Sequence, residues 1–113
     1  MLVEDDWALS QALSTFLMRS LNCEVIGPFQ KVDHQAFEAL ESNAIDAALL
    51  DLCLENGDSR CLAVLLARKG IPFVIMSGLP IQDLDIPTEW RYVDKRVLVR
   101  RLATGVGFLF EPL

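Results

Sequence analysis

Strand-like and helix-like segments alternate along this sequence, which predicts a doubly wound α/β fold: a five-stranded parallel sheet with helices on both faces. Segments 46–52 and 72–77 are almost continuously apolar, as is typical of parallel strands covered on both faces. Segments with apolar residues at helical spacing separate the strand-like ones. The length of 113 residues is usual for one domain with one core, so we expect a single domain over 1–113.

The predicted strands are short and end at polar or turn-forming residues. The first stops at acidic residues, and the second is closed by Gly27 and Pro28. The third runs into Asp51, the fourth into Ser77 and the fifth into Lys95. The five strands are predicted over residues 1–3, 23–27, 46–52, 72–77 and 90–95.

The helices are predicted from apolar periodicity and from capping residues. Asp6 and Asp33 are the expected N-caps of the first two helices, and Gly70 is expected to end the third. Before the fifth strand, Pro80 and Pro87 oppose a regular fourth helix, since proline in a helix interior costs about 3 kcal/mol. We therefore expect that helix to be short or irregular. The other helices are predicted over 7–20, 33–42, 58–68 and 96–110.

Composition excludes several classes of protein. Apolar residues make up 52% and charged residues 23%, a globular composition. The net charge of −6 opposes direct nucleic-acid binding. No apolar run approaches the roughly 18–20 residues needed to span a bilayer, and no secretory signal is visible. The three cysteines are odd in number and lack zinc-type spacing. We expect a cytoplasmic domain with no membrane contact.

Polar residues at the strand ends predict the functional site. In open parallel sheets, ligands bind outside the carboxyl ends of the strands. Those ends carry Glu4, Asp5, Asp51, Ser77 and Lys95. Converging carboxylates repel one another unless a cation joins them, and Mg²⁺ prefers oxygen ligands. The pattern indicates a phosphoryl-transfer site with Asp51 as nucleophile, Ser77 as hydrogen-bond donor, and Lys95 and the metal as neutralising charges.

At these positions the chain resembles the receiver domains of two-component response regulators, of the stand-alone, single-domain type. The resemblance covers nearly the whole chain and rests on "LVEDD" (2–6), "ALLDL" (48–52), "VIMSG" (74–78) and "YVDK" (92–95). "GPFQKVDHQA" (27–36) and "GIPFVIMSG" (70–78) are similar to segments of short receivers. It implies the flavodoxin-like receiver fold, with no output domain after the last helix.

The resemblance also implies a mechanism. Asp51 would accept a phosphoryl group from a sensor histidine kinase or a histidine phosphotransfer protein, with Lys95 and Ser77 assisting. Ser77 and Tyr92 would form the conformational switch, and a downstream protein would receive the signal by direct contact, with homodimer formation left open. Such a domain phosphorylates and slowly dephosphorylates itself and is not a turnover enzyme. The implied Mg²⁺ ligands are Glu4, Asp5, Asp51 and the backbone carbonyl of Cys53.

The chain also departs from the family. Arg96 follows Lys95 where receivers have a proline after a cis peptide, and a non-proline cis bond costs about 2.5–4 kcal/mol. This leaves open a trans bond with a shifted Lys95 loop. The segment between Ser77 and Lys95 is short, and we expect residues to be missing before the first strand. The alternative function is a degenerate receiver that binds proteins without phosphorylation.

Two other functions on related folds fit less well. A hydrolase of the haloacid-dehalogenase type needs a second aspartate two residues after the nucleophile, where this chain has Cys53. A flavin-binding module needs a phosphate-binding loop after the first strand, where this chain has acids. Both therefore remain weaker hypotheses than a receiver.

Overall fold

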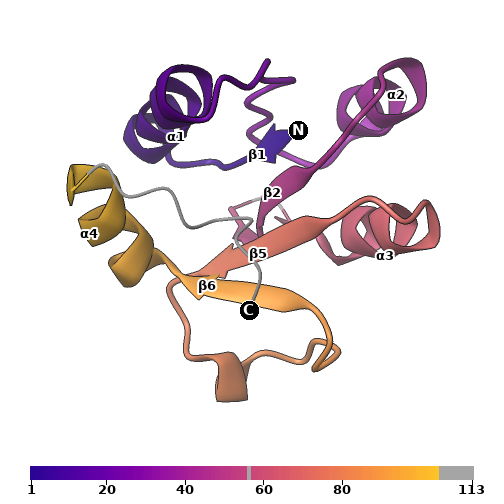
Figure 1. Ribbon diagram of the computed structural model, residues 1–113. Coiled ribbons are helices and arrows are strands. Elements are labelled where there is room, and N and C mark those ends of the chain that lie inside the picture. The colour runs from indigo at the N-terminus through magenta and orange to yellow at the C-terminus, as the bar shows by residue number, and fades with distance from the viewer. Residues whose placement is uncertain (56, 105–113) are drawn as a thin grey trace.

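The computed structural model describes residues 1–55 and 57–104. Over these residues the chain is a mixed α/β domain with a central parallel sheet (Figure 1). Its strands are β1 (Leu2–Val3), β2 (Ala48–Asp51), β3 (Cys53–Leu54), β4 (Gly57–Asp58), β5 (Phe73–Ser77) and β6 (Arg91–Asp94). Its helices are α1 (Trp7–Ser20), α2 (His34–Ser42), α3 (Arg60–Arg68), α4 (Lys95–Thr104) and the 3-10 turn η1 (Ile81–Asp83).

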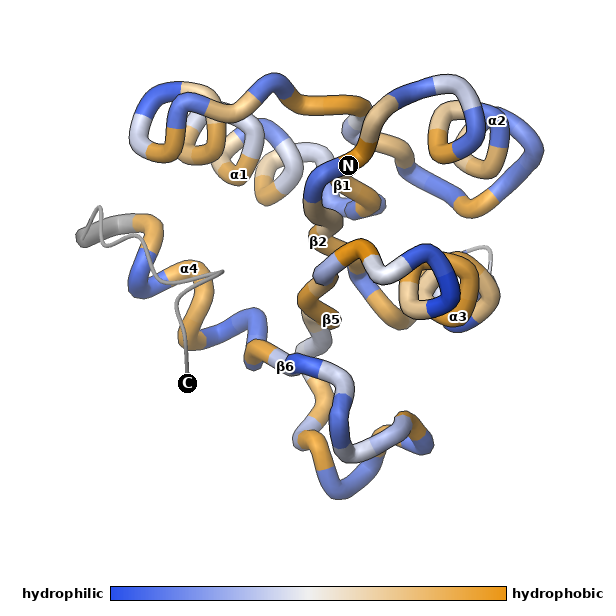
Figure 2. The backbone as a smooth tube through the Cα atoms, turned by 45° about the vertical axis from the view of Figure 1, so that its right-hand side comes forward, coloured by the Kyte–Doolittle hydropathy of each residue, from blue (hydrophilic) through white to orange (hydrophobic). Residues whose placement is uncertain are grey.

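The central sheet has the order β1-β2-β5-β6, and all of its neighbouring strands are parallel. Helices α1 and α4 cover one face, and α2 and α3 cover the other (Figure 1). The residues of β2 and β5, in the middle of the sheet, are mostly hydrophobic (orange in Figure 2). The arrangement is consistent with the doubly wound, flavodoxin-like fold expected from the sequence.

Alternate residues of each strand face opposite cores, as the two-residue period of a strand requires. Leu49 belongs to the core under α1 and α4, together with Met76. Leu50 belongs to the core under α2 and α3, together with Ile75. Because both faces are covered, all four residues of β2 are buried, which accounts for the apolar run that ends at Asp51.

The predicted strand over 23–27 is wrong, so the described sheet has four strands in place of five. The chain still runs beside β1: Ile26 accepts a hydrogen bond from Leu2, and Phe29 donates one back to it. Gly27 and Pro28 both lie between these partners, where regular parallel pairing places one residue. Proline also has no N–H to donate. Only an isolated bridge between Val3 and Phe29 remains there.

The helix ends are set by the capping residues that the sequence predicts. Asp6 accepts a hydrogen bond from the N–H of Leu9 at 2.9 Å and caps α1, and Asp33 caps α2. Helix α3 ends in a Schellman motif, in which Gly70 has a φ of 71° and the N–H of Ile71 bonds to the carbonyl of Leu66. The predicted caps of α1 and α2 and the predicted C-terminal ends of α1, α2 and α3 are confirmed.

The remaining differences lie in short elements. Strands β3 and β4 form an antiparallel hairpin that the sequence did not predict, and α3 begins after it at Arg60 in place of residue 58. The expected short or irregular fourth helix is the single turn η1. Helix α4 begins at Lys95, directly after β6, and not at residue 96. Residues 105–110 of the predicted last helix lie outside the described residues.

Candidate functional site

Three acidic residues meet at the carboxyl ends of β1 and β2. Glu4 and Asp5 follow β1, and Asp51 is the last residue of β2. Each offers a carboxylate oxygen, and these atoms lie within 4.8 Å of one another. Glu4 and Asp51 are buried, with 0% and 1% of their surface exposed. After β1, the chain passes first to the 26–29 segment, which lies on one side of β1, and later to β2, which lies on its other side. The acids therefore lie at the point of the sheet where the strand order reverses.

The ammonium group of Lys95 joins two of these acids. Its Nζ donates to Oδ2 of Asp51 at 2.9 Å and to Oε2 of Glu4 at 3.2 Å, and lies 2.9 Å from Oε1 of Glu4. Lys95 comes from the start of α4, beside the edge strand β6, so its side chain reaches across β5. The trans peptide between Lys95 and Arg96 therefore leaves the ammonium in contact with Asp51.

The pKa values of these groups reflect burial and mutual charge. Burial raises the pKa of Asp51 to about 8; Glu4 adds to the rise, and Lys95 opposes it. The pKa of Asp5 is lowered although burial acts to raise it, chiefly because the N–H of Glu55 bonds to its carboxylate. Burial acts to lower the pKa of Lys95, but its contacts with Asp51 and Glu4 outweigh burial and raise it. Among the described residues, the ammonium of Lys95 is the positive charge in contact with this cluster, and it contacts two of the three acids, so negative charge exceeds positive charge at the site.

The donor set fits a hard divalent cation. Carboxylate oxygens are the ligands that Mg²⁺ and similar ions prefer. Oε1 of Glu4 is buried and receives no hydrogen bond from the described residues, although the Lys95 ammonium is close to it. Asp5 remains partly exposed at the rim, where an ion can enter. The acidic cluster can therefore bind a metal ion.

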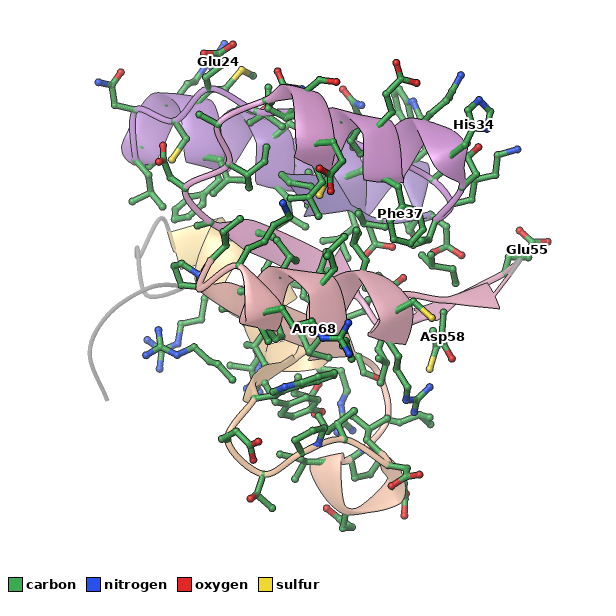
Figure 3. The ribbon with its side chains drawn as sticks, turned by 90° about the vertical axis from the view of Figure 1, so that its right-hand side faces the viewer. Glu24, His34, Phe37, Glu55, Asp58 and Arg68 are labelled. Atoms are coloured by element: carbon green, nitrogen blue, oxygen red, sulfur yellow. The ribbon has the colours of Figure 1, made fainter. Side chains whose placement is uncertain are left out.

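The hairpin β3–β4 is attached to this site by two hydrogen bonds. The hydroxyl of Ser59, which is fully buried, donates to the backbone carbonyl of Asp51. The N–H of Glu55 donates to Oδ2 of Asp5 at 2.7 Å. Glu55 and Asp58 lie together at the hairpin end of the molecule (Figure 3). Sequence reasoning missed Ser59 and Glu55, because contacts to backbone groups leave no residue pattern.

The other predicted site residues lie at or near the same edge. Ser77 ends β5 with 2% of its surface exposed, and its hydroxyl accepts a hydrogen bond from the N–H of Leu79 at 3.0 Å. The hydroxyl of Tyr92 donates to the carbonyl of Leu79 at 2.5 Å. The backbone of Leu79 thus links Ser77 and Tyr92, which the resemblance to receiver domains pairs as a switch without indicating this connection. Cys53 lies in β3, with its side chain exposed.

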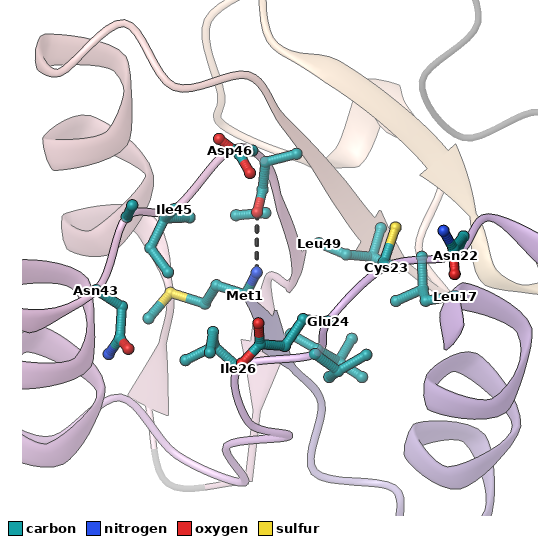
Figure 4. A pocket seen from close by; sticks show the side chains of 15 residues that line it. Met1, Leu17, Asn22, Cys23, Glu24, Ile26, Asn43, Ile45, Asp46 and Leu49 are labelled. Atoms are coloured by element: carbon teal, nitrogen blue, oxygen red, sulfur yellow. Dashed lines mark hydrogen bonds between the residues drawn. The ribbon is translucent and has the colours of Figure 1, made fainter. Parts of the chain in front are cut away.

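A cavity of about 460 Å³ lies at the opposite end of the sheet from the acids (Figure 4). It is lined by residues 22–26 and 43–49 and by Met1, whose ammonium donates to the carbonyl of Ala47 at 2.9 Å. None of the residues predicted for the functional site lines this cavity. The acidic edge therefore remains the candidate site, since the titratable groups with large mutual effects gather there.

The chain is similar to a solved structure. The solution structure of SdrG from Sphingomonas melonis Fr1 superposes with a TM-score of 0.70, at 29% sequence identity, over 92% of each chain. No protein-family model matches the chain, and the comparison with curated proteins found no match. Among the described residues, no helix is long and apolar enough to cross a membrane.

Proposed function

We propose that this chain is a receiver domain of a two-component or phosphorelay system, in which Asp51 accepts a phosphoryl group. The observation that carries the proposal is the contact between Asp51 and Lys95, at 2.9 Å, beside Glu4 and Asp5. A carboxylate nucleophile, an ammonium and a metal-binding acid cluster are the parts that phosphoryl transfer to a carboxylate requires.

The proposed step moves one phosphoryl group. An oxygen of the Asp51 carboxylate attacks the phosphorus of a phosphohistidine on a sensor kinase or a histidine phosphotransfer protein. The new O–P bond forms as the N–P bond breaks, and the imidazole nitrogen keeps the electron pair. The Lys95 ammonium, already in contact with Asp51, neutralises charge on the transferred group.

The site residues also suit Mg²⁺, the ion we propose. Glu4, Asp5 and Asp51 would hold it, with the backbone carbonyl of Cys53 as a further ligand. When bound, the ion supplies positive charge next to the reacting oxygens. Lys95 then no longer needs to neutralise Glu4 and can turn toward the phosphoryl group.

The output of the domain would pass through Ser77 and Tyr92. Both are bonded to the backbone of Leu79, so a shift of the Ser77 hydroxyl toward a phosphoryl group frees the Leu79 N–H and disturbs the segment that Tyr92 holds. A downstream protein or a second copy of the chain would recognise the altered surface. We place this exchange in the cytoplasm, and we propose no direct contact with nucleic acid or membrane.

The similarity to SdrG supports the fold on which the proposal depends, because it extends over nearly the whole of both chains. Within that fold, the carboxyl ends of the strands carry the binding site. The function itself rests on the residues gathered there.

The proposal is tested by incubating the protein with Mg²⁺ and acetyl phosphate and recording its intact mass. We expect a gain of one phosphoryl group in the wild type and in Asp83→Asn, whose exposed acid lies on η1. The gain should be absent in Asp51→Asn and abolished by EDTA.

Because some receivers accept phosphate only from a kinase, the same samples are then titrated with beryllofluoride, which mimics the bound phosphoryl group. Binding that requires Mg²⁺ and Asp51 would support the proposal. A folded wild type that neither gains mass nor binds beryllofluoride would contradict it and favour the phosphorylation-independent binding module.

A further inference from the structure

We propose that Asp94 is a positioning residue, whose carboxylate, held by Arg96, fixes the start of helix α4 and so directs the Lys95 ammonium to Asp51. The inference rests on the proposed function, in which Lys95 assists phosphoryl transfer. It concerns a residue pair that does not touch the acidic cluster.

The position of the Lys95 ammonium depends on the backbone at the start of α4. It is the first residue of α4 and follows the last residue of the edge strand β6 without an intervening loop. Strand β5 separates β6 from β2, and neighbouring strands lie about 4.8 Å apart. The Lys95 side chain must therefore span about two strand spacings to meet Asp51, and a small rotation of the helix start displaces its ammonium.

The contacts of Asp94 hold that start in place. Its Oδ1 accepts a hydrogen bond from the N–H of Arg96 at 2.8 Å, which is the geometry of an N-cap bonded to the second residue of a helix. The Arg96 side chain folds back onto the same carboxylate, with Nε 3.1 Å from Oδ1 and Nη2 2.6 Å from Oδ2. Both oxygens of Asp94 are thus engaged by the residue that follows Lys95.

The strand side of the junction is equally constrained. Asp94 pairs with Ser77 in the parallel register of β6 and β5, so its backbone is part of the sheet. The backbone of Lys95 is therefore held on both sides, by Asp94 in the sheet and by Arg96 in the capped first turn of α4. The ion pair itself is exposed, with 72% of the Arg96 side chain accessible, and exposed pairs contribute little to stability. Its main physical effect is on the direction of Lys95.

The first test observes the Lys95 ammonium directly by ¹H–¹⁵N NMR of lysine-labelled protein without metal, assigned with Lys95→Arg. An ammonium hydrogen-bonded to the side chains of two buried acids exchanges slowly enough to be seen. We expect the signal in the wild type, its loss in Asp94→Ala, and its return in Asp94→Asn, since asparagine also caps helices. A signal that persists in Asp94→Ala, or is missing from the wild type, overturns the inference.

Asp33→Ala is the matched control. Asp33 caps α2 and also pairs with a nearby cation, Lys31, but lies on another element. Its replacement should lower the thermal midpoint as Asp94→Ala does, and should leave the Lys95 signal unchanged. Loss of the signal in both variants would show a general loss of stability, and the inference would be wrong.

The second test measures the rate of phosphorylation by acetyl phosphate. We expect Asp94→Ala to lower the rate about tenfold, as misplacement of a catalytic group does, with the Mg²⁺ concentration for half-maximal rate unchanged. In a Lys95→Ala background the same substitution should have no further effect. Additive losses would contradict a role through Lys95. A wild type that neither accepts a phosphoryl group nor binds beryllofluoride would contradict the proposed function instead, and the NMR result would still decide this inference.

Discussion

At the scale of single residues, the site is organised by a shortage of positive charge around buried acids. Asp51 and Glu4 are shielded from solvent, and one lysine ammonium contacts both. Buried carboxylates without enough partners prefer to be protonated. Burial of Asp51 beside Glu4 raises its pKa, and the same closely spaced acids favour the binding of a divalent cation.

This geometry predicts how stability depends on pH. The pKa of Asp51 is about 8 in the folded protein and 3.8 for an ordinary aspartate, so between these values the folded state holds a proton that the unfolded state has lost. The free energy of unfolding should therefore fall as pH rises from about 4 to about 8. Asp51→Asn should remove this loss and be more stable than the wild type by several kcal/mol at the alkaline end.

Urea denaturation of both proteins at a series of pH values, without divalent metal, measures the difference. Comparing the two curves isolates Asp51 from the other titrating groups. Asp83→Asn should follow the wild type. Parallel curves for the wild type and Asp51→Asn would show that Asp51 titrates in the folded protein as it does in the unfolded chain.

At the scale of elements, local capping decides where the helices stop and start. Helix α3 ends at a glycine in the left-handed region, and the two hydrogen bonds of the Schellman motif close its last turn. The same kind of local device, an aspartate cap, begins α1 and α2. These ends therefore need no information from the rest of the fold.

Gly70→Ala tests this independence. A Cβ at this position meets no atom within 4 Å, so any loss of stability comes from the positive φ alone. We expect a loss of about 1–2 kcal/mol in the free energy of unfolding. Gly78→Ala is the control, because its Cβ also meets nothing and its φ is not positive; it should change stability by less than about 0.5 kcal/mol. Equal effects at the two glycines would refute the assigned role of Gly70.

At the scale of the whole molecule, one sheet joins two cores. Leu49 packs under α1 and α4, and Leu50 packs under α2 and α3, although they are adjacent in β2. Because the strands belong to both cores, neither core can lose its packing without disturbing the other. We therefore expect the domain to unfold as one cooperative unit.

Leu49→Ala and Leu50→Ala should each cost about 2–5 kcal/mol, since both remove fully packed side chains. Leu79→Ala, at a side chain that is 48% exposed, should cost less than about 0.5 kcal/mol. Urea unfolding followed by circular dichroism and by tryptophan fluorescence measures these values. Noncoincident transitions in either core variant would show that the two cores unfold separately.

The sequence by itself determined those features that depend on neighbouring residues. The caps Asp6 and Asp33 and the stop at Gly70 act over one helical turn, so their residue types were sufficient. The apolar runs ending at Asp51 and Ser77 likewise marked two strands of the sheet. The order of these elements indicated helices on both faces, because parallel strands need crossovers.

Only the tertiary structure decided features that depend on a distant partner. The 23–27 segment has strand-like residues, but its ladder to β1 is broken by the two residues Gly27 and Pro28, a matter of register between separate segments. The β3–β4 hairpin has strands of two residues, too short to show a period. The contact of Lys95 with Asp51 depends on the strand order and on where α4 begins, because a side chain can join groups 44 positions apart only after the sheet has set their spacing.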